Sequence, residues 1–153
     1  MTSDIPSLVS FAVLAILALA AAWWDMRTRT LPNWLVIVTF LAGAGFSLWI
    51  GELSDITWHL LHFLAALAIG IGFFALKVWG AGDGKFYAAV AVWFPVQEFL
   101  TLVLSISLVG LVCTIAYFFR FKGKLLSREN NSIPYGVAIG FGALLAYSRG
   151  IMW

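Results

Sequence analysis

Long apolar runs separated by short polar connections dominate the chain. The runs are Leu8–Trp24, Leu35–Ile50, Leu60–Trp79, Phe86–Phe94, Phe99–Phe119 and Ile133–Trp153. An α-helix rises about 1.5 Å per residue, so about 20 residues cross the hydrocarbon core of a bilayer, which is about 30 Å thick. The pattern therefore predicts an all-α membrane protein, a polytopic bundle of about six transmembrane helices in which the fourth is short.

The composition agrees with a lipid environment and excludes several classes of protein. Of the 153 residues, 63% are hydrophobic and 10% are charged, whereas soluble domains carry about 25% charged residues. Disorder, a disulfide framework and a nucleic-acid binder do not fit this apolar content, the single cysteine Cys113 and a net charge of +2. The spans use most of the length, so we expect a single transmembrane domain over residues 1–153.

The basic residues predict the orientation of the helices. All Lys and Arg residues except Arg149 fall in the first, third and fifth connections or at the edges of these connections: Arg27, Arg29, Lys77, Lys85, Arg120, Lys122, Lys124 and Arg128. Connections rich in Lys and Arg stay on the cytoplasmic side of a membrane. We therefore expect these three connections in the cytoplasm and both termini outside, with the basic residues of the fifth connection close to anionic lipid.

Asp25 directly follows the first apolar run, and Arg29 lies four residues further on. At that spacing the two side chains can pair on one helix face, so Asp25 can be explained as a solvated acid at the membrane surface. The helix dipole argues against this explanation, because it disfavours a carboxylate near the C-terminal end of a helix. Asp25 is therefore also a candidate functional acid.

Asp83 lies in the glycine-rich segment Gly80-Ala81-Gly82-Asp83-Gly84-Lys85, between the third and fourth runs. It can be explained as the N-cap of the fourth helix, with the glycines ending the third helix. If Pro95 to Glu98 marks the outer surface, however, the roughly 12 residues back to Asp83 cover only about 18 Å, which leaves Asp83 up to about 12 Å inside the membrane. An ionisable group at such a depth predicts a functional site.

Asp25 and Asp83 approach the same side of the membrane from different helices, where folding can bring them together. Two carboxylates that share a site do not both ionise easily, so one holds a proton while the other remains a base. Such a pair can polarise a water molecule for attack on a peptide carbonyl, hydrogen-bond to the carbonyl oxygen and help the amine to leave. The sequence leaves open which of the two is the acid.

Three motifs, in order along the chain, carry a family resemblance. They are Asp25 followed by Leu31-Pro32-Asn33, the segment from Gly80 to Lys85, and Ile133-Pro134-Tyr135-Gly136 at the start of the sixth run. Together they resemble the type IV prepilin peptidases, which are intramembrane aspartyl proteases of the GxGD type.

The resemblance implies that Asp25 and Asp83 are the catalytic pair. It also implies that the substrate is the leader of a prepilin or pseudopilin, cut at the cytoplasmic side of the bacterial inner membrane after a glycine that precedes the apolar helix of the pilin. The motif residues that are expected to support the site are Pro32, Asn33, Gly80, Gly82, Gly84, Lys85, Pro134, Tyr135 and Gly136.

The chain departs from the larger members of that family. Those members carry a cytoplasmic domain with paired CxxC metal sites and also N-methylate the mature pilin, whereas this chain has Cys113 alone. We therefore expect a peptidase without a soluble methyltransferase domain, a metal or another cofactor, similar to the short forms that serve Flp or tight-adherence pili. The implied partners are the prepilin substrates, membrane lipid and the pilus assembly machinery, and no nucleic acid.

Some of these motif residues also have purely structural explanations. Pro32 and Asn33 can start the second helix, with Asn33 capping its exposed amides. The Pro134-Tyr135-Gly136 motif can be a helix entry, and Lys85 can be an anchor at the cytoplasmic surface.

Three alternative functions are less well supported by the sequence: a metal site, a proton-coupled carrier and a structural subunit. His59 and His62 share a helix face, but with Asp55 they offer too few ligands for a metal site. A proton-coupled carrier would use membrane acids as a relay, yet the second, third, fifth and sixth runs contain no acid to continue one. A structural subunit with a degenerate site is a further alternative, and the intact acids and glycines argue against it.

Overall fold

The computed structural model describes residues 4–51, 53–120 and 135–151, and every regular element in these ranges is helical. The elements are α1 (Asp4–Thr28), α2 (Asn33–Ile50), α3 (Ile56–Ala75), α4 (Ala81–Ala91), the 3-10 helix η1 (Val96–Glu98), α5 (Phe99–Arg120) and α6 (Tyr135–Ile151). They confirm the predicted all-α bundle with a short fourth helix. The predicted residues Pro134, Lys122, Lys124 and Arg128 lie outside the described residues.

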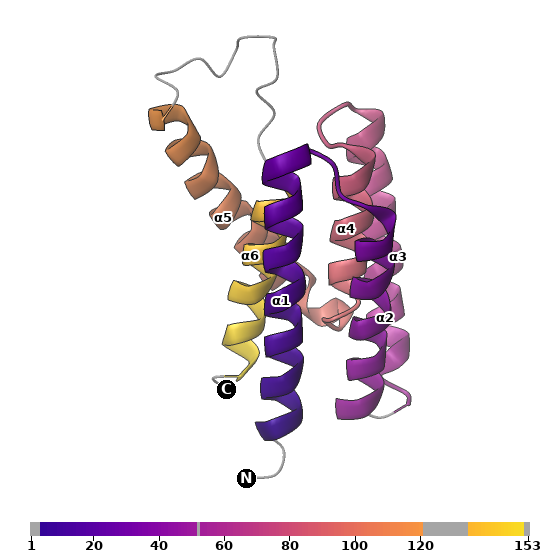
Figure 1. Ribbon diagram of the computed structural model, residues 1–153. Coiled ribbons are helices and arrows are strands. Elements are labelled where there is room, and N and C mark those ends of the chain that lie inside the picture. The colour runs from indigo at the N-terminus through magenta and orange to yellow at the C-terminus, as the bar shows by residue number, and fades with distance from the viewer. Residues whose placement is uncertain (1–3, 52, 121–134, 152–153) are drawn as a thin grey trace.

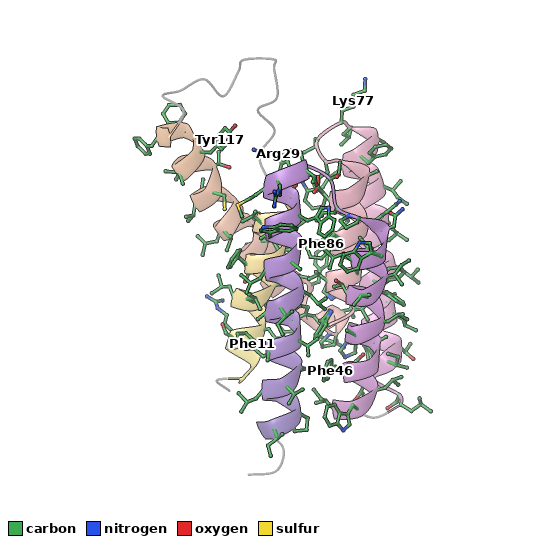
Figure 2. All side chains as sticks on the ribbon, viewed as in Figure 1. Phe11, Arg29, Phe46, Lys77, Phe86 and Tyr117 are labelled. Atoms are coloured by element: carbon green, nitrogen blue, oxygen red, sulfur yellow. The ribbon has the colours of Figure 1, made fainter. Side chains whose placement is uncertain are left out.

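Four segments are long and apolar enough to cross a membrane: Ile5–Thr28, Asn33–Ile50, Ile56–Ala75 and Val96–Phe119. Large apolar side chains cover the outer faces of the helices (Figure 2), among them Leu104 and Leu111, which are 67% and 56% exposed. Such a surface needs lipid rather than water. The chain is therefore a membrane protein. The helix α4, with 11 residues, is too short to cross the bilayer.

The helices alternate in direction along the bundle (Figure 1). Both termini lie at one end, which we call the terminal end, and the α1–α2 and α3–α4 connections lie at the other, which we call the connection end. The main contacts pair α1 with α6, α5 with α6, and α3 with α4, and α2 also packs on α4. The residues of α4 from Phe86 to Ala91 are all buried, as is typical of a helix that is apolar on every side.

The turn from α4 to α5 is recessed into the bundle and does not reach its terminal end (Figure 1). Val92, Trp93 and Phe94 are all buried in this turn. The expectation that Pro95 to Glu98 marks the outer surface is therefore wrong, and so is the depth of Asp83 that was derived from it. The helix α4 is short because its C-terminal end stops inside the bundle.

Two histidines allow a helix to end in this apolar interior. The last carbonyl groups of a helix have no partner within the helix, and they need other donors where water is absent. The Nδ1 atom of His59 donates to the Val92 carbonyl at 2.7 Å, and Nδ1 of His62 donates to the Phe94 carbonyl at 3.0 Å. The three-residue spacing that placed both rings on one face of α3 therefore serves the α4–α5 turn.

The other end of α4 also differs from the sequence-based expectation. The helix begins at Ala81, five residues before the run Phe86–Phe94, so the glycine-rich segment starts a helix instead of ending one. A Cβ added to Gly84 would lie 3.1 Å from the Cα of Gly70 in α3. The two backbones thus touch, which only small residues permit in a membrane bundle.

Candidate active site

A pocket of about 650 Å³ lies at the connection end of the bundle. Its walls come from the end of α1, the α3–α4 connection, the first turn of α4 and the start of α6. The lining residues are Asp25, Arg29, Phe74, Ala75, Lys77, Val78, Trp79, Gly80, Asp83 and Tyr135. The fold therefore brings the two predicted acids into one pocket, together with Gly80 and Tyr135 from the predicted motifs.

Asp25 lies in the last turn of α1, and only 5% of its surface is exposed. The backbone N–H of Gly136, in the first turn of α6, donates to its Oδ2 at 2.8 Å. A helix N-terminus offers unpaired N–H groups and the positive end of the helix dipole, both of which stabilise a carboxylate. Arg29 interacts electrostatically with Asp25 as its spacing predicted, but the burial of Asp25 contradicts a solvated surface acid.

The close seat of Asp25 on α6 explains the glycine of the Pro-Tyr-Gly motif. A Cβ added to Gly136 would lie 2.9 Å from Oδ2 of Asp25 and 3.0 Å from its Cβ. Any larger residue at this position would displace the carboxylate. The motif is thus a helix entry, as the structural explanation held, and one of its residues also fixes an acid of the pocket.

Asp83 is the third residue of α4, and the N-cap position belongs to Gly80, so the expectation of Asp83 as the N-cap is wrong. Its Oδ2 accepts a hydrogen bond from the Gly80 N–H at 3.1 Å. Burial is the main factor that raises the pKa of Asp83 to about 6, and the nearby Asp25 carboxylate raises it further. The two acids therefore interact directly through their charges, and the pair gains a proton as the pH falls toward 6.

The remaining motif residues position α4 without lining the pocket. Pro32, in an extended conformation, is the N-cap of α2 and provides no side-chain cap. The expected capping by Asn33 is not found: its Oδ1 accepts a hydrogen bond from Nζ of Lys85 at 3.4 Å. This bond links α2 to α4, so Lys85 is more than an anchor at the membrane surface. Gly82 leaves room for Leu31, to which an added Cβ would come within 3.4 Å.

Two basic residues at the pocket had no signal as site residues in the sequence. Arg29 and Lys77 follow the ends of α1 and α3, and both have left-handed backbones, with φ angles of 56° and 58°. Glycine is usual at such positions, because the conformation costs other residues roughly 1–2 kcal/mol. Figure 2 shows Lys77 at the connection end, with its side chain extending outward from the bundle. In the sequence, the charge of Lys77 was only a marker of orientation, whereas Arg29 was also a possible partner of Asp25.

Trp79 forms the wall between the pocket and the interior of the bundle. Its ring packs against Tyr87 at 5.5 Å and against Tyr135 at 6.0 Å between centroids, and Phe73 contacts it at 4.9 Å. Aromatic rings at these separations pack favourably edge to face. The tryptophan thereby ties the α3–α4 connection to α4 and α6 next to the acids.

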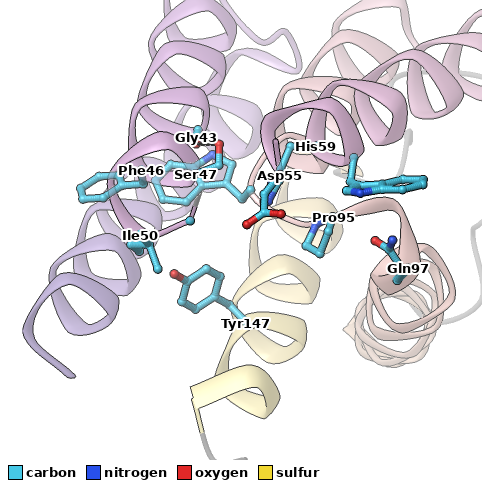
Figure 3. A pocket seen from close by; sticks show the side chains of 12 residues that line it. Gly43, Phe46, Ser47, Ile50, Asp55, His59, Pro95, Gln97 and Tyr147 are labelled. Carbon is cyan, nitrogen blue, oxygen red and sulfur yellow. Dashed lines mark hydrogen bonds between the residues drawn. The ribbon is translucent and has the colours of Figure 1, made fainter. Parts of the chain in front are cut away.

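A second pocket, of about 400 Å³, lies toward the terminal end, beneath the recessed α4–α5 turn. Figure 3 shows Asp55, His59 and Tyr147 around it. The described part of the chain has no group of three or more His, Cys, Asp or Glu side chains that could hold a metal ion. Since Nδ1 of His59 is bound to the Val92 carbonyl, its ring is part of the fold on this side.

Comparison with known protein families gave a match. A family model of the type IV leader peptidases matches residues 12–115, a range that contains both Asp25 and Asp83. Neither the curated proteins nor the solved structures gave a significant match.

Proposed function

The chain belongs to the type IV leader peptidase family, and we propose that it is an intramembrane aspartyl endopeptidase whose catalytic pair is Asp25 and Asp83. Its substrate in this proposal is the leader of a type IV prepilin or pseudopilin, of the kind found in Flp pili. One observation carries the proposal: the two acids, 58 residues apart in the sequence, line one pocket, and each is fixed by a backbone N–H at the start of a helix.

The surroundings of the two acids support different roles for them. Burial disfavours the charged form of Asp25, whereas the N-terminus of α6 and Arg29 favour it. Among the described residues, Asp83 has only the Gly80 N–H to favour its charge and no basic partner, so in the proposal it holds the shared proton. In the proposal the Asp25 carboxylate takes a proton from a water molecule, whose oxygen attacks the peptide carbonyl while Asp83 protonates the carbonyl oxygen. The proton on Asp25 then passes to the departing amine, and Asp83 takes back a proton from a hydroxyl group of the intermediate as this collapses to the carboxylic acid.

The charges of the connection end support a cytoplasmic active site. Arg27 and Arg29 follow the first apolar run, and Lys77 and Lys85 flank the start of α4. Under the positive-inside rule these connections remain in the cytoplasm of a bacterial cell, with both termini on the far side of the inner membrane. A leader that stays in the cytoplasm would then reach the pocket without crossing the bilayer.

The proposal is tested by co-expressing the chain with a tagged Flp-type prepilin and weighing the pilin by intact mass spectrometry. The parent is expected to remove the leader and leave an N-terminus without an added methyl group. Asp25→Asn and Asp83→Asn should leave the prepilin uncut. Asp55→Asn is a matched control, because it changes a carboxylate that lies at the second pocket. Cleavage by either of the first two variants, in folded form, would refute the dyad.

A further inference from the structure

An apolar groove of about 510 Å³ lies between α3 and α5. Gly72 and Phe73 line it from α3, Val103 and Ile106 from α5, and Trp79 and Tyr87 complete the lining. The two helices that form its sides pack elsewhere, since α3 has its main contacts with α4 and α5 with α6. The groove therefore exists because no helix of the described chain fills the space between them.

The groove leads to the candidate active site. Trp79 lines both the groove and the pocket that holds Asp25 and Asp83. Phe73 lines the groove, and its neighbour Phe74 lines the pocket. By contrast, a smaller apolar hollow between α2, α3 and α4 shares no lining residue with that pocket. The α3–α5 groove and the pocket of the two acids therefore adjoin at Trp79.

Gly72 keeps the α3 side of the groove open to the backbone of another helix. A glycine inside a helix costs roughly 1 kcal/mol relative to alanine, so it needs a reason. At Gly70 the reason is the close contact with Gly84. At Gly72, however, a Cβ would meet nothing within 4 Å. In membranes, glycines on a helix face allow the backbone of a second helix to approach closely.

Tyr87 gives an independent sign that the groove is incomplete. The residue is 2% exposed, and its hydroxyl has no hydrogen-bond partner among the described residues. An unsatisfied hydroxyl is costly in an apolar medium. The acyl chain of a lipid could fill the groove, but it offers neither a donor nor an acceptor, and it has no use for a glycine. A peptide helix can place its backbone over Gly72, and a polar side chain on it offers the Tyr87 hydroxyl a partner once the Tyr87 ring turns toward the groove.

We propose that the groove between α3 and α5 binds the apolar helix of the substrate, with its backbone over Gly72 and its cleaved end directed past Trp79 toward Asp25 and Asp83. This inference rests on the proposed function, in which the cut precedes an apolar helix. A peptide bond inside a helix has its carbonyl in a hydrogen bond, so the cleaved segment must be extended. Trp79 marks the place where the bound chain changes from helix to extended segment.

Two glycines provide a matched test of this groove. Gly72→Leu fills the groove, whereas Gly45→Leu adds the same side chain to α2, at a glycine that also has nothing within 4 Å of its Cβ. Each variant is given a full-length Flp-type prepilin and a short soluble peptide that carries the cleavage site without the apolar helix. Gly72→Leu is expected to lower kcat/KM for the prepilin at least about tenfold and to leave the short peptide within about twofold of the parent.

The outcomes of this test separate the groove from the catalytic pocket. Gly45→Leu should cut both substrates like the parent. Unchanged cleavage of the prepilin by Gly72→Leu would overturn the proposal. An equal loss on both substrates would also overturn it, because the damage would then lie in the catalytic pocket or in the fold.

Cross-linking tests the groove without relying on catalysis. In a Cys113→Ala, Asp83→Asn background, Val103→Cys places a thiol in the groove and Ile37→Cys places one in the smaller hollow. A prepilin with one cysteine in its apolar helix should form a disulfide with the first variant only. A groove filled by lipid would give no such bond and would overturn the proposal. If the parent cuts no prepilin, the proposed function fails, whatever the cross-link shows.

Discussion

The two ends of α4 both place titratable side chains inside an apolar bundle, but they do so in different ways. At the C-terminal end, His59 and His62 each donate to one backbone carbonyl, so every ring removes one unsatisfied group from the interior. At the N-terminal end, Asp83 likewise satisfies the Gly80 N–H, yet it also lies near the charge of Asp25. Bonds to backbone carbonyls thus account for Nδ1 of both rings, whereas the buried Nε2 of His62 has no partner among the described residues.

Capping does not explain why two acids share a pocket. A second carboxylate near Asp83 makes ionisation of the pair less favourable. Asp25 does satisfy an N–H at the start of α6, but the capping of two separate helices does not require the two acids to be neighbours. Unfavourable electrostatic arrangements of this kind are maintained at functional sites, where they adjust the protonation of catalytic groups. The comparison thus separates the two histidines, which stabilise the fold, from the two acids, whose arrangement adjusts their protonation, although both kinds of residue are ionisable.

The largest effect is expected at the acids. Asp25→Asn and Asp83→Asn should each lower prepilin cleavage at least about 10³-fold, because a dyad needs one base and one acid. Neither variant should lower the unfolding temperature in detergent, since an amide oxygen can still accept the bond from Gly136 or Gly80. If Asp83→Asn lost activity only because it unfolded, Asp83 would have a structural role like that of the histidines and no catalytic role.

The histidine end should show the opposite behaviour. His62→Ala leaves the Phe94 carbonyl without its donor and opens a cavity at a fully buried position, so we expect the free energy of unfolding to fall by about 3 kcal/mol. Cleavage, measured well below the unfolding temperature, should stay within about threefold of the parent. Leu104→Ala, at a residue that is 67% exposed, is the control for loss of apolar side-chain volume. A large loss of activity in folded His62→Ala would contradict the distinction between a structural C-terminal end of α4 and a catalytic N-terminal end.

Gly136 links the fold to the chemistry and should give an intermediate effect. In Gly136→Ala the new Cβ, 2.9 Å from the Asp25 Oδ2, must push the carboxylate off the α6 N-terminus. We expect cleavage to fall by about tenfold to a hundredfold with a folded protein. Gly110→Ala is the matched control, because its Cβ would make an ordinary contact of 3.6 Å with Ala138. Equal activity of the two variants would show that Asp25 does not depend on this anchor.

The pH dependence should give the smallest effect. Because the pKa of Asp83 is about 6, kcat/KM should rise about fivefold as the pH falls from 7 to 6 and the dyad gains its proton. The raised pKa also means that the folded protein binds this proton more tightly than the unfolded chain. The resulting stabilisation is fully present below the ordinary pKa of 3.8 and is lost as the pH rises through about 6. Asp83→Asn should remove this part of the pH dependence of the unfolding temperature.

The sequence predicted the six helices and both acids because these depend on local features. Length and hydropathy set the spans, and the motifs name Asp25 and Asp83. The start of α4 could not be predicted, because it depends on the contact of Gly84 with Gly70, which comes from another helix. The role of His62 depends on a carbonyl 32 residues away in the sequence. The left-handed backbone of Arg29 and the bond from Lys85 to Asn33 are equally products of tertiary packing.

The anchoring of both carboxylates to backbone amides also determines how freely the site can mutate. Every residue except proline supplies a backbone N–H, so the anchors make no chemical demand on the side chains around them. They make a demand on space: an added Cβ would lie 3.0 Å from Oδ2 of Asp83 at Gly80, and 2.9 Å from Oδ2 of Asp25 at Gly136. Intolerance to substitution should therefore concentrate in two acids and two glycines, while the apolar walls remain free to drift among residues of similar volume.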